Sequence, residues 1–108
     1  MERQALLAAF DEIARRRGWA PLHTPKNLAM ALSVEVAELN RHLQWRDDAE
    51  IAQLMAGDRA PEVAAELADV QMYLVKLADT LGVDLDAALT DKVAENRRRC
   101  ELAERGDG

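Results

Sequence analysis

The feature that most constrains the fold is a long apolar repeat in the second half of the chain. Between Pro61 and Gly82, apolar residues recur at intervals of 4, 3, 4, 3 and 4, at Val63, Leu67, Val70, Leu74, Leu77 and Leu81. Such intervals are typical of an α-helix that packs lengthwise against another helix. Proline suits the first turn of a helix and glycine its end, so this apolar repeat predicts a helix from Pro61 to about Leu81.

Two further helices are predicted in the first half of the chain. Residues 2–17 carry an apolar stripe at helical spacing that stops at Gly18. A loop follows, and Thr24 then offers a side-chain oxygen as an N-cap, with Pro25 at the first helical position. The leucines and valines after it keep helical spacing, which predicts a helix over residues 25–45.

A fourth helix is predicted over residues 85–102, with Asp84 as its N-cap. Residues 46–60 form a charged connection with at most a short helical turn over residues 49–55. No segment alternates apolar and polar residues as a half-buried strand does. We therefore expect an all-α, bundle-like protein of four helices that forms one domain over residues 1–108.

Charge and cysteine content exclude several classes of protein. The net charge of −6 argues against non-specific binding to nucleic acid, which needs a basic face. Two basic clusters, Arg15–Arg17 and Arg97–Arg99, are either solvated helix ends or contacts to an anionic ligand. The single Cys100 excludes an internal disulfide and any cysteine-based zinc site. With no long apolar run, we expect neither a signal peptide nor a membrane span, and a cytoplasmic protein.

Two consecutive predicted helices carry acidic pairs with a spacing of three. These are Glu35 with Glu38, and Glu66 with Asp69. That spacing places each pair on one helical face, beside the apolar stripe. If the helices pack antiparallel, the four carboxylates converge, and they cannot all stay ionised without cations. Carboxylate oxygens are the ligands that Mg²⁺ and Mn²⁺ prefer, so one interpretation is a site for such a cation. The alternative is that the two acidic faces are simply solvated.

The two histidines do not fit the known patterns of iron or zinc sites. A di-iron bundle uses Glu-x-x-His on two helices, but His42 follows Glu38 by four residues and no second such histidine exists. Zinc hydrolysis is equally unsupported, since only His23 and His42 are available.

Other polar and aromatic residues have two interpretations each. Asn96 shares a sector with Leu89 and Val93, so it is either a buried structural amide or a ligand contact. Lys92 is either a surface lysine or a phosphate contact. Trp19 and Trp45 are either lids on the core or flat surfaces on which a nucleobase stacks.

These residues together resemble a known family, the all-α nucleoside triphosphate pyrophosphohydrolases of MazG type, and within it the dCTP pyrophosphatase branch. The resemblance extends from about Phe10 to Arg99 and rests on RGWAPLHTPKNLAMAL, SVEVAELNRHLQW, AELADVQMYLVKLADTLGVDLDAAL and KVAENRRR, in this order. It implies Mg²⁺ ligation by Glu35, Glu38, Glu66 and Asp69. It also implies base and sugar contacts from Trp19, His23, Trp45, Tyr73 and Asn96, with Lys92 near the phosphates.

The resemblance further implies a MazG-like fold that assembles into an oligomeric helical bundle, as a homodimer or homotetramer. The implied reaction is hydrolysis of a dNTP, dCTP or a 5-substituted relative, to dNMP and pyrophosphate for nucleotide-pool house-cleaning. Glu38, which lies furthest outside its apolar stripe, is our candidate for positioning or deprotonating the attacking water. Ala65 and Cys100 depart from the family pattern, and Cys100 bears on base preference. The alternatives are a non-catalytic helical interaction module and a nucleotide sensor.

Overall fold

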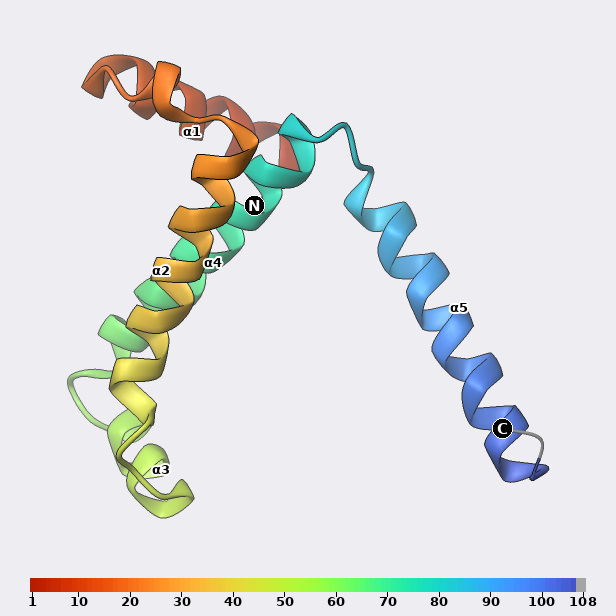
Figure 1. Cartoon of the computed structure of the whole chain (residues 1–108). Coiled ribbons are helices and arrows are strands. Elements are labelled where there is room, and N and C mark those ends of the chain that lie inside the picture. Colours follow the sequence, from red (N-terminus) through yellow and green to blue (C-terminus); the bar gives the residue numbers. More distant parts are fainter. Residues whose placement is uncertain (107–108) are drawn as a thin grey trace.

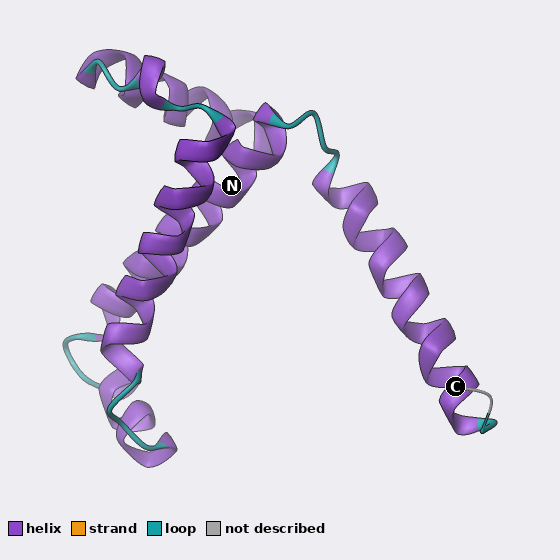
Figure 2. Cartoon of the chain, viewed as in Figure 1, coloured by secondary structure: helices purple, strands orange, loops and turns teal. Residues whose placement is uncertain are grey.

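The structure is a computed structural model that describes residues 1–106, and it is helical throughout (Figures 1 and 2). In chain order the elements are α1 (Arg3–Arg17), a short 3₁₀ helix η1 (Ala20–Leu22), α2 (Pro25–Leu43), α3 (Asp48–Ala56), α4 (Ala60–Thr80) and α5 (Leu85–Glu104). The described part of the chain contains no strand. The prediction of an all-α protein is therefore confirmed.

The predicted number of helices was wrong, because the connection contains a complete helix, α3. Its N-terminus is a capping box: the Asp47 carboxylate accepts from the Glu50 amide at 2.8 Å, and the Glu50 carboxylate accepts from the Asp47 amide at 3.1 Å. Leu54 is buried and anchors the short helix. Reciprocal capping together with one buried leucine thus makes a helix where the high charge suggested a loop.

For the other four helices, the predicted boundaries agree with the structure to within about two residues. The reason is that the predicted capping residues form their hydrogen bonds in the structure. Thr24 accepts from the Asn27 amide at 3.4 Å, and Asp84 accepts from the Ala87 amide at 3.0 Å. Gly18 ends α1 with a φ of 72°, in the left-handed region. That conformation turns the chain so that the Trp19 amide donates to the Ala14 carbonyl at 2.8 Å.

Replacing Gly18 with alanine is expected to lower the free energy of unfolding by about 1–2 kcal/mol, the cost of left-handed backbone for a residue with a Cβ. No atom lies within 4 Å of the added carbon, so the cost is conformational and not steric. Urea unfolding measures it. Gly57→Ala is the control, because Gly57 has a φ of −98°. Equal losses in the two variants would contradict this account of Gly18.

The antiparallel pair of α2 and α4 forms the centre of the fold, with α1 packed across the C-terminal part of α4 (Figure 1). Leu28 of α2 is fully buried, and α1 contributes the buried side chains Leu6, Leu7, Phe10 and Ala14. Asp11 also forms an ion pair with the largely buried Lys76 at 2.9 Å, which ties α1 to α4. This arrangement brings α1, the following loop and the middle of α4 to one place.

Helix α5 stands apart from the other helices (Figure 1). None of its residues is buried, and Leu89 and Val93 are exposed. The radius of gyration is 17.9 Å, whereas a compact domain of this length measures about 13 Å. Asn96 is exposed in the single chain, so of its two interpretations the structure does not show the buried structural amide.

The apolar repeat on α4 is only partly covered. Val63 is buried, but Leu67, Leu74 and Leu81, which are seven residues apart, are 40–57% exposed. A seven-residue interval keeps these leucines on one side of the helix. A continuous apolar stripe therefore remains open on the central helix pair. Among residues 1–106, no helix is both long and apolar enough to cross a membrane.

Candidate functional site

Three of the four predicted ligand carboxylates converge between the two central helices. Glu35 comes from α2, and Glu66 and Asp69 lie one turn apart on α4. One oxygen from each lies within 4.8 Å of the others, and all three residues are half-buried. We call these residues the acidic triad. Because α2 and α4 are antiparallel, residues distant in sequence meet at mid-length of the pair.

The electrostatics of the acidic triad suit a divalent cation. Burial raises the pKa of Glu35 above its ordinary value of 4.5, and the negative charges of Asp69, Glu66 and Glu38 raise it further. The Oε2 atom of Glu66 is buried and has no hydrogen-bond partner within residues 1–106. A buried carboxylate oxygen without a donor is costly unless a cation meets it. Mg²⁺ or Mn²⁺ binds oxygen ligands and would offset the mutual repulsion of these carboxylate charges.

Glu38 is held differently from the acidic triad. Its carboxylate lies 3.2 Å from Nη1 of Arg41, one turn further along α2, in an ion pair near the surface. Such exposed pairs contribute little stability and are readily exchanged. Glu38 therefore lies next to the site without being part of the converged group.

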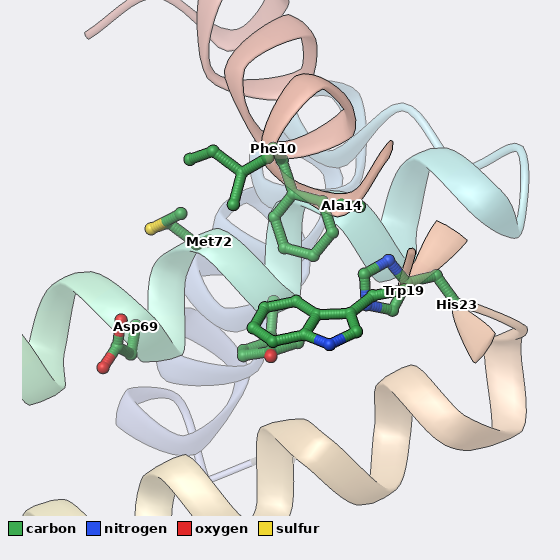
Figure 3. Close-up of a pocket in the computed structure, with 8 residues that line it drawn as sticks. Phe10, Ala14, Trp19, His23, Asp69 and Met72 are labelled. Carbon is green, nitrogen blue, oxygen red and sulfur yellow. The ribbon is translucent and has the colours of Figure 1, made fainter. Parts of the chain in front are cut away.

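A cavity lined largely by aromatic side chains adjoins the acidic triad (Figure 3). It is lined by Phe10, Ile13, Ala14, Trp19, His23, Asp69, Met72 and Tyr73. The rings of Phe10 and His23 are 5.0 Å apart between centroids, and Tyr73 meets Phe10 edge to face at 5.6 Å. Three of the predicted base-contacting residues, Trp19, His23 and Tyr73, thus share one cavity.

Asp69 belongs both to the acidic triad and to the wall of the aromatic cavity. Tyr73 follows it by one helical turn on the same face of α4. Burial raises the pKa of Tyr73, and the charges of Glu35 and Asp69 add to the rise, which places its phenol in the field of the triad. The cation-binding chemistry and the flat apolar surfaces are therefore contiguous.

Three predicted substrate contacts lie elsewhere in the chain. Trp45 follows the C-terminus of α2, and 87% of its surface is exposed. Lys92 and Asn96 are exposed on α5, away from the central pair (Figure 1), and Lys92 pairs there with Glu95 at 3.3 Å. A single chain does not bring these residues to the acidic triad.

Sequence reasoning did not assign Phe10, Ile13 or Met72 to the site. Phe10 and Ile13 belong to the apolar stripe of α1, and nothing in that pattern separates a core residue from a cavity wall. Met72 lies between Asp69 and Tyr73 without any motif of its own. Whether these residues line the cavity depends on how α1 packs across α4, and this tertiary contact cannot be read from local sequence patterns.

The raised pKa of Glu35 predicts a pH-dependent stability in the metal-free protein. Between 4.5 and the folded-state pKa, the folded protein binds more protons than the unfolded chain, so the free energy of unfolding falls as the pH rises through that window and stays lower above it. Glu35→Gln is therefore expected to raise the melting temperature in EDTA at about pH 7. The rise should be smaller when the pH is near 4.5, the ordinary pKa of the side chain.

Thermal melts across this pH range test the prediction. Glu101→Gln on the exposed side of α5 is a control for loss of one negative charge. A melting temperature that responds to pH identically in the two variants would contradict it.

Comparison with known proteins gives consistent results. The model of the MazG-like family matches residues 30–107. Over 89 residues, 82% of this chain, the sequence is 42% identical to "dCTP pyrophosphatase 1" of Rattus norvegicus and equally identical to that of Homo sapiens. The chain spans about half the length of these relatives, 52% in both cases.

A crystal structure of a pyrophosphatase from Archaeoglobus fulgidus is similar over most of the fold. Its TM-score is 0.79 and its sequence identity 39%, and the match covers 89% of both chains. The helical architecture, the family match and the identity over most of the sequence agree with one another. The chain belongs to the MazG-like family.

Proposed function

We propose that this protein hydrolyses a deoxynucleoside triphosphate to the monophosphate and pyrophosphate in the presence of a divalent metal ion. The observation that carries the proposal is the double role of Asp69, which joins the acidic triad to the aromatic cavity. A nucleotide has the matching chemistry, because its phosphates bind metal ions and its flat base stacks on aromatic rings. No other cluster in the described residues joins these two properties.

The names of the relatives support this substrate class. Two are dCTP pyrophosphatases and one is a pyrophosphatase. We extend their activity to this chain and assign dCTP, or a 5-substituted relative, as the preferred substrate. The role would be removal of unwanted nucleotides from the cytoplasmic pool.

Glu35, Glu66 and Asp69 would hold the metal ion, with Glu38 as a fourth ligand, and Mg²⁺ is our choice. When bound, Mg²⁺ supplies neutralisation of charge on the triphosphate and on the leaving pyrophosphate. The three carboxylates are negatively charged, so binding of the anionic triphosphate beside them depends on that neutralisation. Mn²⁺ has the same preference for oxygen and would substitute.

In the proposed reaction, a water oxygen forms a bond to the α-phosphorus while the bond between this phosphorus and the bridging oxygen breaks, and pyrophosphate leaves. We assign Glu38 to accept the proton of that water. Its carboxylate lies beside the acidic triad, and its surface ion pair with Arg41 is weak enough to open. His23, Trp19 and Tyr73 would hold the base in the cavity while this occurs.

We also propose that the active species is a homodimer or homotetramer. Leu67, Leu74 and Leu81 form an open stripe on α4, while Leu89 and Val93 are exposed on α5. Monomeric proteins rarely expose contiguous apolar surface of this kind. A second copy would cover both surfaces and would bring Trp45, Lys92 and Asn96 to the triad, which one chain alone leaves incomplete.

Asn96→Ala is expected to reduce discrimination between dCTP and purine nucleotides by on the order of 1–3 kcal/mol. The amide offers a donor and an acceptor, which match the acceptor and exocyclic amine of cytosine. Ratios of kcat/KM for dCTP and dATP measure the loss, and Mn²⁺ affinity of the two proteins serves as the control. Unchanged ratios would remove Asn96 from base recognition.

A panel of dNTPs, each assayed with Mg²⁺ and with EDTA, separates the three candidate functions. Mg²⁺-dependent release of pyrophosphate, fastest with dCTP, supports the enzyme. Binding of nucleotide without turnover would indicate a sensor, and neither binding nor turnover would indicate a helical interaction module. Comparable kcat/KM for dCTP, dATP and dGTP would leave a hydrolase of broad range.

A further inference from the structure

The end of α1 places a cation over one wall of the aromatic cavity. Cζ of Arg17, the last residue of α1, lies 4.8 Å from the centroid of the Trp19 ring. This distance is within the range of a cation–π contact, and a guanidinium is planar and stacks on an indole. The left-handed Gly18 turns the chain between them and allows the two side chains to meet.

Trp19 lines the cavity, and the Arg17 side chain that lies over its ring does not. Figure 3 shows the Trp19 ring lying across the cavity close to His23 and Phe10. Within residues 1–106, Arg17 is not among the residues that line the cavity. The guanidinium covers one face of the indole, so a base can stack only on the other face.

Trp19 is exposed, although it shares the cavity with Phe10 and His23. It is 41% exposed, and it lies in the loop between α1 and η1. An exposed aromatic side chain on a loop samples several rotamers, and ordering it at the moment of binding costs conformational entropy. A planar cation over the ring restricts those rotamers before the ligand arrives.

We propose that Arg17 is a positioning residue for the base: it holds the indole of Trp19 as a preformed wall of the cavity and so increases affinity for the nucleotide. This inference rests on the proposed function for the identity of the ligand. Arg17 acts through Trp19 and takes no part in the chemistry at the acidic triad. Its loss therefore raises KM and leaves kcat nearly unchanged.

Substitutions at Arg17 separate charge, planarity and packing. Arg17→Met keeps an apolar stem and removes the charge. Arg17→Lys keeps the charge and loses the planar stack, so it is expected to restore part of the effect. Arg16→Ala is the matched control, because Arg16 is its neighbour in the same helical turn, pairs with Glu12 at 3.5 Å and does not contact the indole.

The fluorescence measurements use the full chain with Trp45→Phe, so that Trp19 is the only tryptophan, and the kinetic measurements use chains that keep Trp45, because it is itself a proposed base contact. Acrylamide quenching of its fluorescence reads the accessibility of the indole without nucleotide. Steady-state kinetics with dCTP give KM and kcat, fluorescence titration with dCMP reads base binding without turnover, and inhibition by pyrophosphate reads the phosphate site alone.

For Arg17→Met we expect stronger quenching and a KM about 2- to 5-fold higher, the size of an exposed cation–π contact, with an unchanged inhibition constant for pyrophosphate. Arg17→Lys is expected to lie between the parent and Arg17→Met, and Arg16→Ala to match the parent. Unchanged quenching and KM in Arg17→Met would overturn the proposal. So would an inhibition constant for pyrophosphate that rises with KM, since Arg17 would then act on the phosphates directly.

The same measurements distinguish this inference from the proposed function. If the parent protein releases no pyrophosphate from any dNTP, the proposed function fails. Quenching and the dCMP titration still compare Arg17→Met with the parent in that event. Weaker binding with stronger quenching supports the role of Arg17, and equality in both overturns it.

Discussion

Replacing Glu66 with glutamine or Asp69 with asparagine is expected to reduce turnover by more than about 100-fold, a loss that even outer-shell partners of a metal can reach when removed. Both residues lie in the acidic triad with oxygens within 4.8 Å of the other carboxylates. An amide keeps the shape of the side chain but loses the charge that attracts the cation. Steady-state kinetics at saturating Mg²⁺ measure the effect.

The metal-free variants are expected to be as stable as the parent protein or more stable, because one charge is removed from a crowded acidic cluster. Glu62→Gln is the matched control, since Glu62 lies on the same helix, is exposed and pairs with Arg59 at 2.9 Å. It should retain full activity. Retained activity in both triad variants would remove these residues from the ligand set, and unfolding of the variants in EDTA would contradict the electrostatic account.

Val93→Asp is expected to convert the protein to a monomer and to abolish activity with it. Val93 is exposed in the single chain, and in the proposed assembly it is covered by a second copy. Burying an unpaired carboxylate costs several kcal/mol, which corresponds to a loss of subunit affinity of more than about 100-fold. In the proposed assembly, activity is lost as well, because Lys92 and Asn96 would no longer reach the triad of the other copy.

Sedimentation equilibrium at micromolar concentration tests the assembly. Ala94→Asp introduces the same charge at the adjacent position, on a different side of α5, and should leave the oligomer intact. A parent protein that sediments as a stable, folded and active monomer would contradict the proposed assembly.

The sequence predicted the helices well because local signals determine where they begin and end. Thr24, Asp84 and Gly18 act in the structure as their residue types suggest, through caps that depend only on neighbouring residues. For residues 48–56 the prediction was at most a short helical turn, because the charged composition is typical of a loop. The capping box of Asp47 and Glu50 was not considered. A search for Asp-x-x-Glu ahead of an apolar residue would have found α3.

The position of α5 could not be predicted from periodicity. Leu89, Val93 and Asn96 share a helical sector, and that pattern indicates a face to be covered without showing which surface covers it. In the structure of the single chain this face, Asn96 included, is exposed. A repeat predicts that a helix packs, but the partner depends on tertiary or quaternary contacts.

The site was predictable where it depends on helical spacing and on one antiparallel contact. The acidic pairs Glu35 with Glu38 and Glu66 with Asp69 border the apolar stripes, and packing α2 on α4 brings three of the four together. The cavity was not predictable in full, because its wall from Phe10 depends on how α1 crosses α4. Side chains from separate elements meet through packing that no local pattern encodes.

The central claim is attack of water at the α-phosphorus of a dNTP, and isotope labelling tests it most directly. The protein is incubated with dCTP and Mg²⁺ in ¹⁸O-labelled water, and the masses of the products are measured by mass spectrometry. We expect equal amounts of dCMP and pyrophosphate, with the label in dCMP alone and no reaction in EDTA. Label in inorganic phosphate or pyrophosphate, or dCDP as a product, would contradict the account, as would the absence of any turnover.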